Sequence, residues 1–228
     1  MSDGKVDLRQ EQAATLSRPR MTYLPMARML FRAMDAVYGK ELTYPKVRML
    51  ETLARIPYQA WETRHYSLLS TRHKDLAEVE RAEKVIGWGR SAQDNEFWHL
   101  LVIEEKMRQE GMREGRFWEA MAPRLACFKY AWFCRILARL NLRRAFYLNA
   151  EFEDHAEHEY MHFVATHPEL ERQKVEGDVI QKFGPFDSWA DVFRRIGLDE
   201  REHMNNSFRF YGTPERVVPY ASIPGSAP

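Results

Sequence analysis

Apolar residues recur at helical spacing along nearly all of this 228-residue chain, and that spacing constrains the fold more than any other feature. No segment shows the two-residue alternation that is typical of a β-strand. Long helices joined by modest loops favour an all-α bundle. The expected helices cover residues 24–38, 45–70, 76–110, 115–166 and 187–210, with breaks expected near Gly87, Gly89 and Asn141 and a stop at Gly212.

The two ends of the chain are more polar and irregular than its middle. Residues 1–20 predict a flexible N-terminal arm, and residues 217–228, which contain Pro, Ser and Gly, predict a flexible C-terminal tail. Between them, residues 21–216 predict one domain, because this length and a hydrophobic fraction of 45% suit a single core.

The composition excludes several classes of protein. The net charge of +1 gives no general attraction to nucleic acid. No run of 18 apolar residues predicts a transmembrane helix, and the first twenty residues lack the apolar segment of a secretory signal. Cys127 and Cys134 are seven residues apart, as on one stripe of a helix, and predict buried core thiols in a reducing compartment.

Two Glu-x-x-His pairs, at 96–99 and 200–203, carry the clearest chemical pattern. Residues three apart face the same side of a helix, so each pair directs one carboxylate and one imidazole to the same point. Glu51 precedes the first pair by 45 residues, and Glu153 precedes the second by 47. This order predicts a ferritin-like four-helix bundle that holds two metal ions, with additional amphipathic helices.

A single Glu-x-x-His pair is not specific, because two more occur at 62–65 and 159–162. Burial favours the chosen set, since Glu51 and Glu96 lie among apolar residues and a buried carboxylate is costly unless it is paired or bound to a metal. Spacing alone does not select the third acidic ligand. Its candidates are Glu151, Glu153, Asp154, Glu157 and Glu159, with His155 and His158 beside them.

At these residues the chain resembles the alternative oxidase family, the cyanide-insensitive quinol oxidases. The resemblance runs in order from about Asp35 to Asn206. Four segments carry it: Leu50-Glu51-Thr52 resembles the LET motif, Asn95 to Leu100 the NERMHL motif, Phe152 to Ala156 a degenerate LEEEA motif, and Asp199 to His203 the end of the RADEAHH motif.

The resemblance implies a di-iron centre and a role for particular residues. Tyr160 corresponds to a tyrosine implicated in oxygen reduction, and Asn95 and Asp199 to residues that orient the ligands. The six iron ligands that the resemblance implies are Glu51, Glu96, His99, Glu153, Glu200 and His203.

Three residues occupy positions that border the quinone pocket in the family: Lys46, Leu50 and Glu159. Lys46 replaces an arginine and so loses the planar fork of that side chain. Glu159 replaces a threonine, and the third motif keeps one of its three glutamates. These departures leave iron binding as expected and leave the identity of the quinol open.

Residues 124–144 interleave bulky apolar side chains with arginines and a lysine, which is typical of a helix lying in a membrane interface. Its basic residues suit anionic headgroups, and residues 24–38 offer a second apolar face. We expect association with one leaflet, without a transmembrane helix, and a homodimer could use the same helices. The lack of a targeting segment suggests the cytoplasmic face of a bacterial inner membrane.

The resemblance therefore implies an oxidoreductase of the respiratory chain, which transfers electrons from ubiquinol or a related quinol to O2 without pumping protons. Three alternatives remain. They are another di-iron enzyme that activates O2, such as a quinone-biosynthesis hydroxylase or an oxygenase, a ferritin-like iron-binding protein, and a helical interaction module without a metal.

Overall fold

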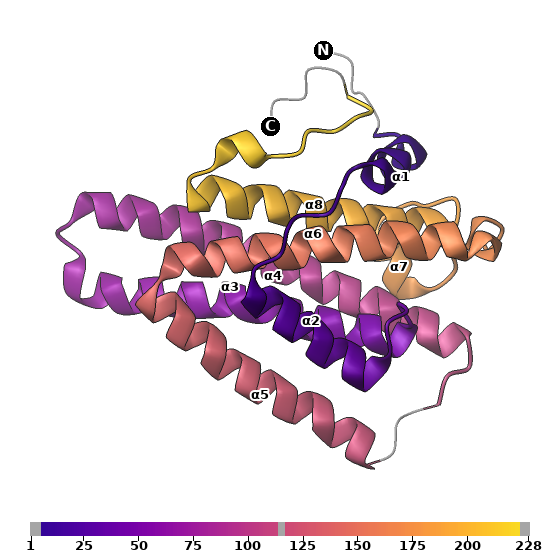
Figure 1. Cartoon of the computed structure of the whole chain (residues 1–228), viewed down its shortest axis with the longest axis horizontal. Coiled ribbons are helices and arrows are strands. Elements are labelled where there is room, and N and C mark those ends of the chain that lie inside the picture. Colours follow the sequence, from indigo (N-terminus) through magenta and orange to yellow (C-terminus); the bar gives the residue numbers. More distant parts are fainter. Residues whose placement is uncertain (1–5, 114–116, 224–228) are drawn as a thin grey trace. The chain divides into compact units, whose positions relative to one another are not determined.

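The computed structural model describes residues 6–113 and 117–223 (Figure 1). Within these ranges the protein is all-helical, with eight α-helices, two short 3-10 helices and no strand. The all-α prediction is therefore confirmed. The helices form two compact units, of which the first comprises Met1–Leu42 and Phe146–Pro228 and the second comprises Thr43–Ala145.

The second unit consists of three long helices. They are α3 (Tyr44–Arg72), α4 (Leu76–Gln109) and α5 (Phe117–Leu140). A three-residue connection makes α3 and α4 an antiparallel pair, and the Asp75 side chain caps α4 by accepting a hydrogen bond from the Glu78 N–H. Helix α4 continues through Gly87 and Gly89, so the breaks expected there do not occur.

An aromatic cluster fixes how α3 packs on α4. The Tyr58 ring lies 4.9 Å from the Trp61 ring and 5.5 Å from the Trp88 ring, measured between centroids. Tyr58 and Trp61 are fully buried. At Gly89 an added Cβ would be in ordinary van der Waals contact with Tyr58, 3.5 Å from its carbonyl oxygen, so α4 packs directly on the backbone of α3 there. These contacts hold the axial register of the two helices.

The first unit is built around two long helices that pack together. The helices of this unit are α1 (Leu8–Ser17), α2 (Pro25–Tyr38), α6 (Leu142–Thr166), α7 (Asp178–Phe183) and α8 (Trp189–Tyr211), with 3-10 helices η1 (Pro168–Glu171) and η2 (Pro214–Arg216). Ser188 caps α8 at its start, and Gly212 ends it in the left-handed conformation at φ 91°, as expected. The break near Asn141 also occurs, between α5 and α6.

Both ends of the described chain are packed, which corrects the expectation of a flexible arm and tail. Helix α1 forms within the expected arm, with Asp7 as its N-cap and with Glu11 and Thr15 fully buried. The C-terminal segment is held by Val218, whose backbone N–H and carbonyl form two hydrogen bonds with the side chain of Asn205. Residues 1–5 and 224–228 lie outside the described part.

Helix α5 carries an exposed apolar stripe with exposed basic residues interspersed along it. In the described part of the chain, no helix has an apolar stretch long enough to cross a membrane. Cys134 on α5 is buried as expected, whereas Cys127 is only half-buried. The stripe consists of Leu125, Phe128, Trp132, Ile136 and Leu140, each more than half exposed, and the basic residues beside it are Arg124, Lys129, Arg135 and Arg139.

Candidate metal centre

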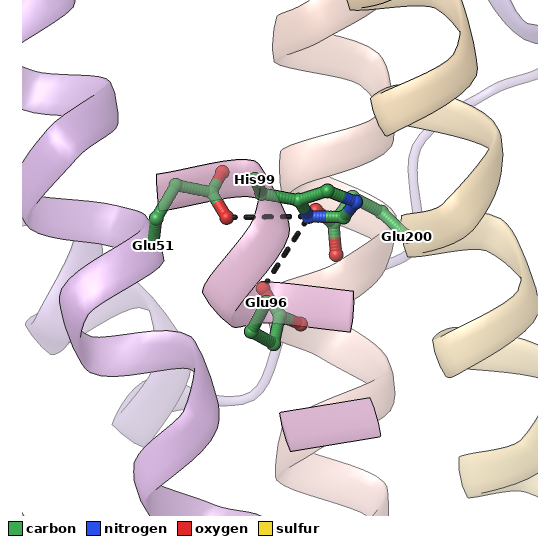
Figure 2. Close-up of side chains that lie close together, drawn as sticks. All are labelled: Glu51, Glu96, His99 and Glu200. Carbon is green, nitrogen blue, oxygen red and sulfur yellow. Dashed lines mark ion pairs between the residues drawn. The ribbon is translucent and has the colours of Figure 1, made fainter. Parts of the chain in front are cut away.

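In the second unit, α3 and α4 bring together two carboxylates and one imidazole. Glu51 lies on α3, and Glu96 and His99 lie one turn apart on α4 (Figure 2). Nδ1 of His99 is 3.3 Å from Glu51 and 3.6 Å from Glu96. All three side chains are buried, and their ligating atoms lie within 4.8 Å of one another.

The register of the helix pair explains why these residues meet. Glu51 is seven residues before Tyr58 on α3, and Glu96 is seven residues after Gly89 on α4. Because the two helices are antiparallel, moving back along α3 and moving forward along α4 lead the same way in space. Seven residues correspond to about 10 Å along each helix axis. The close contact between Tyr58 and Gly89 therefore sets Glu51 opposite Glu96, and helical spacing adds His99.

In the first unit, α6 and α8 bring together a triad of the same composition. Glu153 lies on α6, and Glu200 and His203 lie on α8. Their ligating atoms are within 4.8 Å of one another, and Nδ1 of His203 is 3.4 Å from Glu200. The Asn149 side chain donates hydrogen bonds to Glu153 at 2.8 Å and to the hydroxyl of Ser207 at 3.1 Å. Asn149 therefore orients the Glu153 carboxylate.

The structure separates the acidic residues of 151–162, which spacing alone did not. Glu153 joins the triad. Glu151 accepts a hydrogen bond from the Leu24 N–H at the start of α2, and Asp154 and Glu157 form ion pairs with Arg18. Three of these acids therefore hold the N-terminal segment in place.

The donor chemistry of each triad fits a metal ion. Two ionised carboxylates and one imidazole together carry a net negative charge, and burying that charge is costly without a cation. Carboxylate oxygen and imidazole nitrogen together suit first-row transition metals such as iron, manganese and zinc. Each buried triad could therefore hold a metal ion.

The other residues expected at the site lie close to these candidate ligands along their helices. Asn95 is partly buried beside Glu96, and Asp199 is buried beside Glu200 and accepts a hydrogen bond from Arg195 at 2.9 Å. Tyr160 is fully buried, two turns after Glu153 on α6. Its ring stacks on Phe193 with a centroid distance of 6.3 Å.

The three residues expected to border a quinone pocket differ in burial and in their contacts. Lys46 is buried on α3, five residues before Glu51, and Leu50 is partly buried. Glu159 forms a 2.7 Å ion pair with Arg20, which also contacts the His155 ring nitrogen at 2.9 Å. Sequence reasoning missed the partner of Glu159, because Arg20 lies 139 residues away in a segment that was expected to be an arm.

The chain matches no protein-family model, and a search of curated proteins finds no significant similarity to it. The resemblance to alternative oxidases therefore depends on the four motifs alone. The all-α fold and the two buried triads do not depend on that resemblance.

Proposed function

We propose that the two triads are halves of one di-iron centre, and that the protein is a quinol oxidase of the alternative oxidase type. One observation carries the proposal: each unit buries one lone glutamate beside one Glu-x-x-His pair, in the same order along the chain. Two such halves make up the ligand set of a carboxylate-bridged metal pair in a helical bundle.

The proposed reaction oxidises two quinol molecules and reduces one O2. Each quinol loses two electrons and two protons, and the four electrons and four protons convert O2 into two molecules of water. Iron, when bound, would supply the one-electron redox chemistry. The protein's own part is to hold the ligands in place, as Asn149 does for Glu153, and to exclude water from the buried carboxylates.

Tyr160 is proposed as the residue that delivers an electron and a proton during oxygen reduction. Its burial and its position two turns after Glu153 support this role. Tyr160→Phe keeps the ring that stacks on Phe193 and removes only the hydroxyl. We expect kcat to fall at least tenfold in this variant while metal content stays at the wild-type level. An unchanged kcat would remove Tyr160 from the mechanism.

Lys46, Leu50 and Glu159 are the proposed contacts to the quinol. A second candidate function, an oxygenase or hydroxylase built on the same ligands, is favoured by the ion pair between Glu159 and Arg20. This pair puts charge where the resemblance predicts a threonine. Oxygen labelled with a heavy isotope separates the two functions, because an oxidase delivers the label to water and an oxygenase delivers it to the organic product.

We also propose that α5 docks on one membrane leaflet, which would give the protein access to quinol. Its exposed apolar stripe with interspersed basic residues supports this, and exposed Met29 and Val37 on α2 offer a second surface. Trp132→Glu should weaken sedimentation with anionic vesicles, whereas Leu76→Glu, at an exposed leucine on α4, should not. If Trp132→Glu instead changes only the oligomeric state, the stripe is a dimer interface.

The deciding experiment measures iron per chain in protein purified with mild detergent, followed by oxygen uptake on addition of ubiquinol. Two irons with quinol-dependent uptake that cyanide does not inhibit are the expected result. Two irons without uptake would favour the oxygenase. No bound metal after anaerobic loading with ferrous iron would refute the di-iron centre.

A further inference from the structure

A buried ionic network joins α1, α6 and α8 at the first-unit triad. Its centre is Arg201, which directly follows Glu200 and has a side chain only 2% exposed. The three nitrogens of its guanidinium donate to three different side chains. Nε donates to Glu157 at 2.9 Å, Nη1 to Glu11 at 2.5 Å, and Nη2 to the hydroxyl of Thr15 at 2.7 Å.

The acceptors are themselves held by further hydrogen bonds. The Thr15 hydroxyl donates to Glu157 at 2.6 Å, and Arg18 donates to the other oxygen of Glu157 at 2.6 Å. The second carboxylate oxygen of Glu11, which Arg201 does not contact, accepts hydrogen bonds from the backbone N–H and the hydroxyl of Ser222. Burial raises the pKa of Glu11, but the hydrogen bonds from Ser222 and Arg201 outweigh it, so that this pKa lies below its ordinary value.

The network lies at the level of the metal ligands. Glu157 is one turn after Glu153 on α6, and Arg201 lies between Glu200 and His203 on α8. The link from Arg201 to Glu157 therefore ties the two helices together within one turn of all three ligands.

Two more contacts belong to the same antiparallel register. Asn149 bonds to Ser207 on one side of the ligands, and on the other side an added Cβ at Gly197 would lie 3.2 Å from Cβ of Tyr160. Gly197 allows a close approach but permits sliding, and Asn149 to Ser207 is one hydrogen bond. The guanidinium fork, with three donors in a fixed plane, is the most directional of the three contacts.

We propose that Arg201 is a positioning residue for the metal centre, and that α1 is part of the centre's scaffold because it supplies Glu11 and Thr15 to the fork. The inference rests on the proposed function only in assuming that Glu153, Glu200 and His203 bind metal. Arg201 itself is not a ligand. It acts by fixing the register of α6 against α8, so that the Glu153 carboxylate stays opposite the pair on α8.

A buried ion pair can often be replaced by neutral groups without loss of stability. If Arg201 sets the register of α6 against α8, such a replacement should disturb the register and leave stability in place. The test therefore uses Arg201→Met combined with Glu11→Gln and Glu157→Gln, which removes the buried charges of both signs together. Single Arg201→Met would leave two buried carboxylates without the fork and would confuse misfolding with mispositioning.

The chain offers a matched control at Arg194, on the same helix. Arg194 is also buried and also reaches α1, because its Nε donates to Gln12 at 2.8 Å, and it forms an ion pair with Glu171. It lies six residues before Glu200, about 9 Å along the helix. Arg194→Met with Glu171→Gln therefore removes a comparable contact between α1 and α8 away from the triad.

The first readout is cobalt(II) binding, followed by the visible absorption of the bound ion and by urea unfolding of the metal-free protein. We expect the triple variant to bind cobalt at least tenfold more weakly, with an altered spectrum, while its urea midpoint stays close to that of the Arg194 control. The control should bind like wild type. Equal binding by the triple variant and wild type, or equal weakening of the triple variant and the control, would overturn the proposal.

A second readout needs no metal. Asn149→Cys with Ser207→Cys, in a background with Cys127→Ser and Cys134→Ala, reports the register through the rate of disulfide formation. The triple variant should slow this rate several-fold and the Arg194 control should not; an unchanged rate also overturns the proposal. A wild-type protein that binds no metal refutes the di-iron centre, and the cross-linking rate still decides whether Arg201 sets the register.

Discussion

Replacing Asn149 with leucine tests whether a single hydrogen bond orients a metal ligand. Leucine has the same branched heavy-atom skeleton as asparagine, so Asn149→Leu removes the hydrogen bonds to Glu153 and Ser207 without leaving a cavity. A hydrogen bond to a charged acceptor contributes about 2 kcal/mol, and one to a neutral hydroxyl about 1 kcal/mol. The free energy of unfolding of the metal-free protein should therefore fall by about 3 kcal/mol.

Metal binding should be affected separately from stability. The Glu153 carboxylate that has lost its orienting donor can turn away from Glu200 and His203, and the loss of such a contact typically weakens metal affinity by about 10- to 100-fold. Urea denaturation followed by circular dichroism measures the first effect, and cobalt titration measures the second.

Asn205→Leu is the matched control for this prediction. Asn205 is a buried asparagine on α8 with two hydrogen bonds, but both go to the backbone of Val218 and neither reaches a ligand. This variant should lose about 2 kcal/mol of unfolding free energy and keep its cobalt affinity. The reasoning is refuted if Asn149→Leu loses less than about 1 kcal/mol, or if the two variants bind cobalt equally well.

Three further predictions follow from the same structure. Glu96→Ala or His203→Ala should each reduce bound metal and abolish quinol-dependent oxygen uptake, and normal activity in either variant with depleted iron would contradict the ligand assignment. Burial lowers the pKa of His65 below its ordinary value of 6.5, and the nearby Arg64 adds to this effect. The unfolded chain then binds the proton more readily, so unfolding free energy should fall as pH drops below about 6.5, and urea denaturation of His65→Phe should show a smaller fall. Burial also raises the pKa of the Cys127 thiol, so iodoacetamide at mildly alkaline pH should modify it more slowly in the folded than in the unfolded protein; equal rates would contradict the burial.

Local features of this protein were predictable from its amino-acid pattern. Helical periodicity located the long helices, and the stops at Asn141 and Gly212 were correct. The two Glu-x-x-His pairs were also predictable from helical spacing. Residues three apart on a helix share a face. The position of Glu51 opposite the first pair was also predictable from sequence. A short connection between two helices of similar length leaves one simple antiparallel pairing.

Tertiary packing selects which polar residues face inward where helical spacing allows several. Within 151–162 the acidic residues cover more than one face of α6, and the packing of α8, α1 and residues 18–24 gives each its role. Glu153 meets Glu200 and His203, whereas Glu157 meets Arg201. The sequence shows the charges, but the partner of each charge comes from another helix.

The N-terminal segment shows the same limit most clearly. Its polar residues predicted a solvated arm, yet Glu11 and Thr15 are fully buried because Arg201, 190 residues from Glu11, satisfies them. A polar residue can be buried at low cost only when its hydrogen-bond partners are in place. No local sequence pattern predicts a partner so distant along the chain. Local sequence thus located the helices and the two Glu-x-x-His pairs, and only tertiary packing created the buried ionic network of α1, α6 and α8.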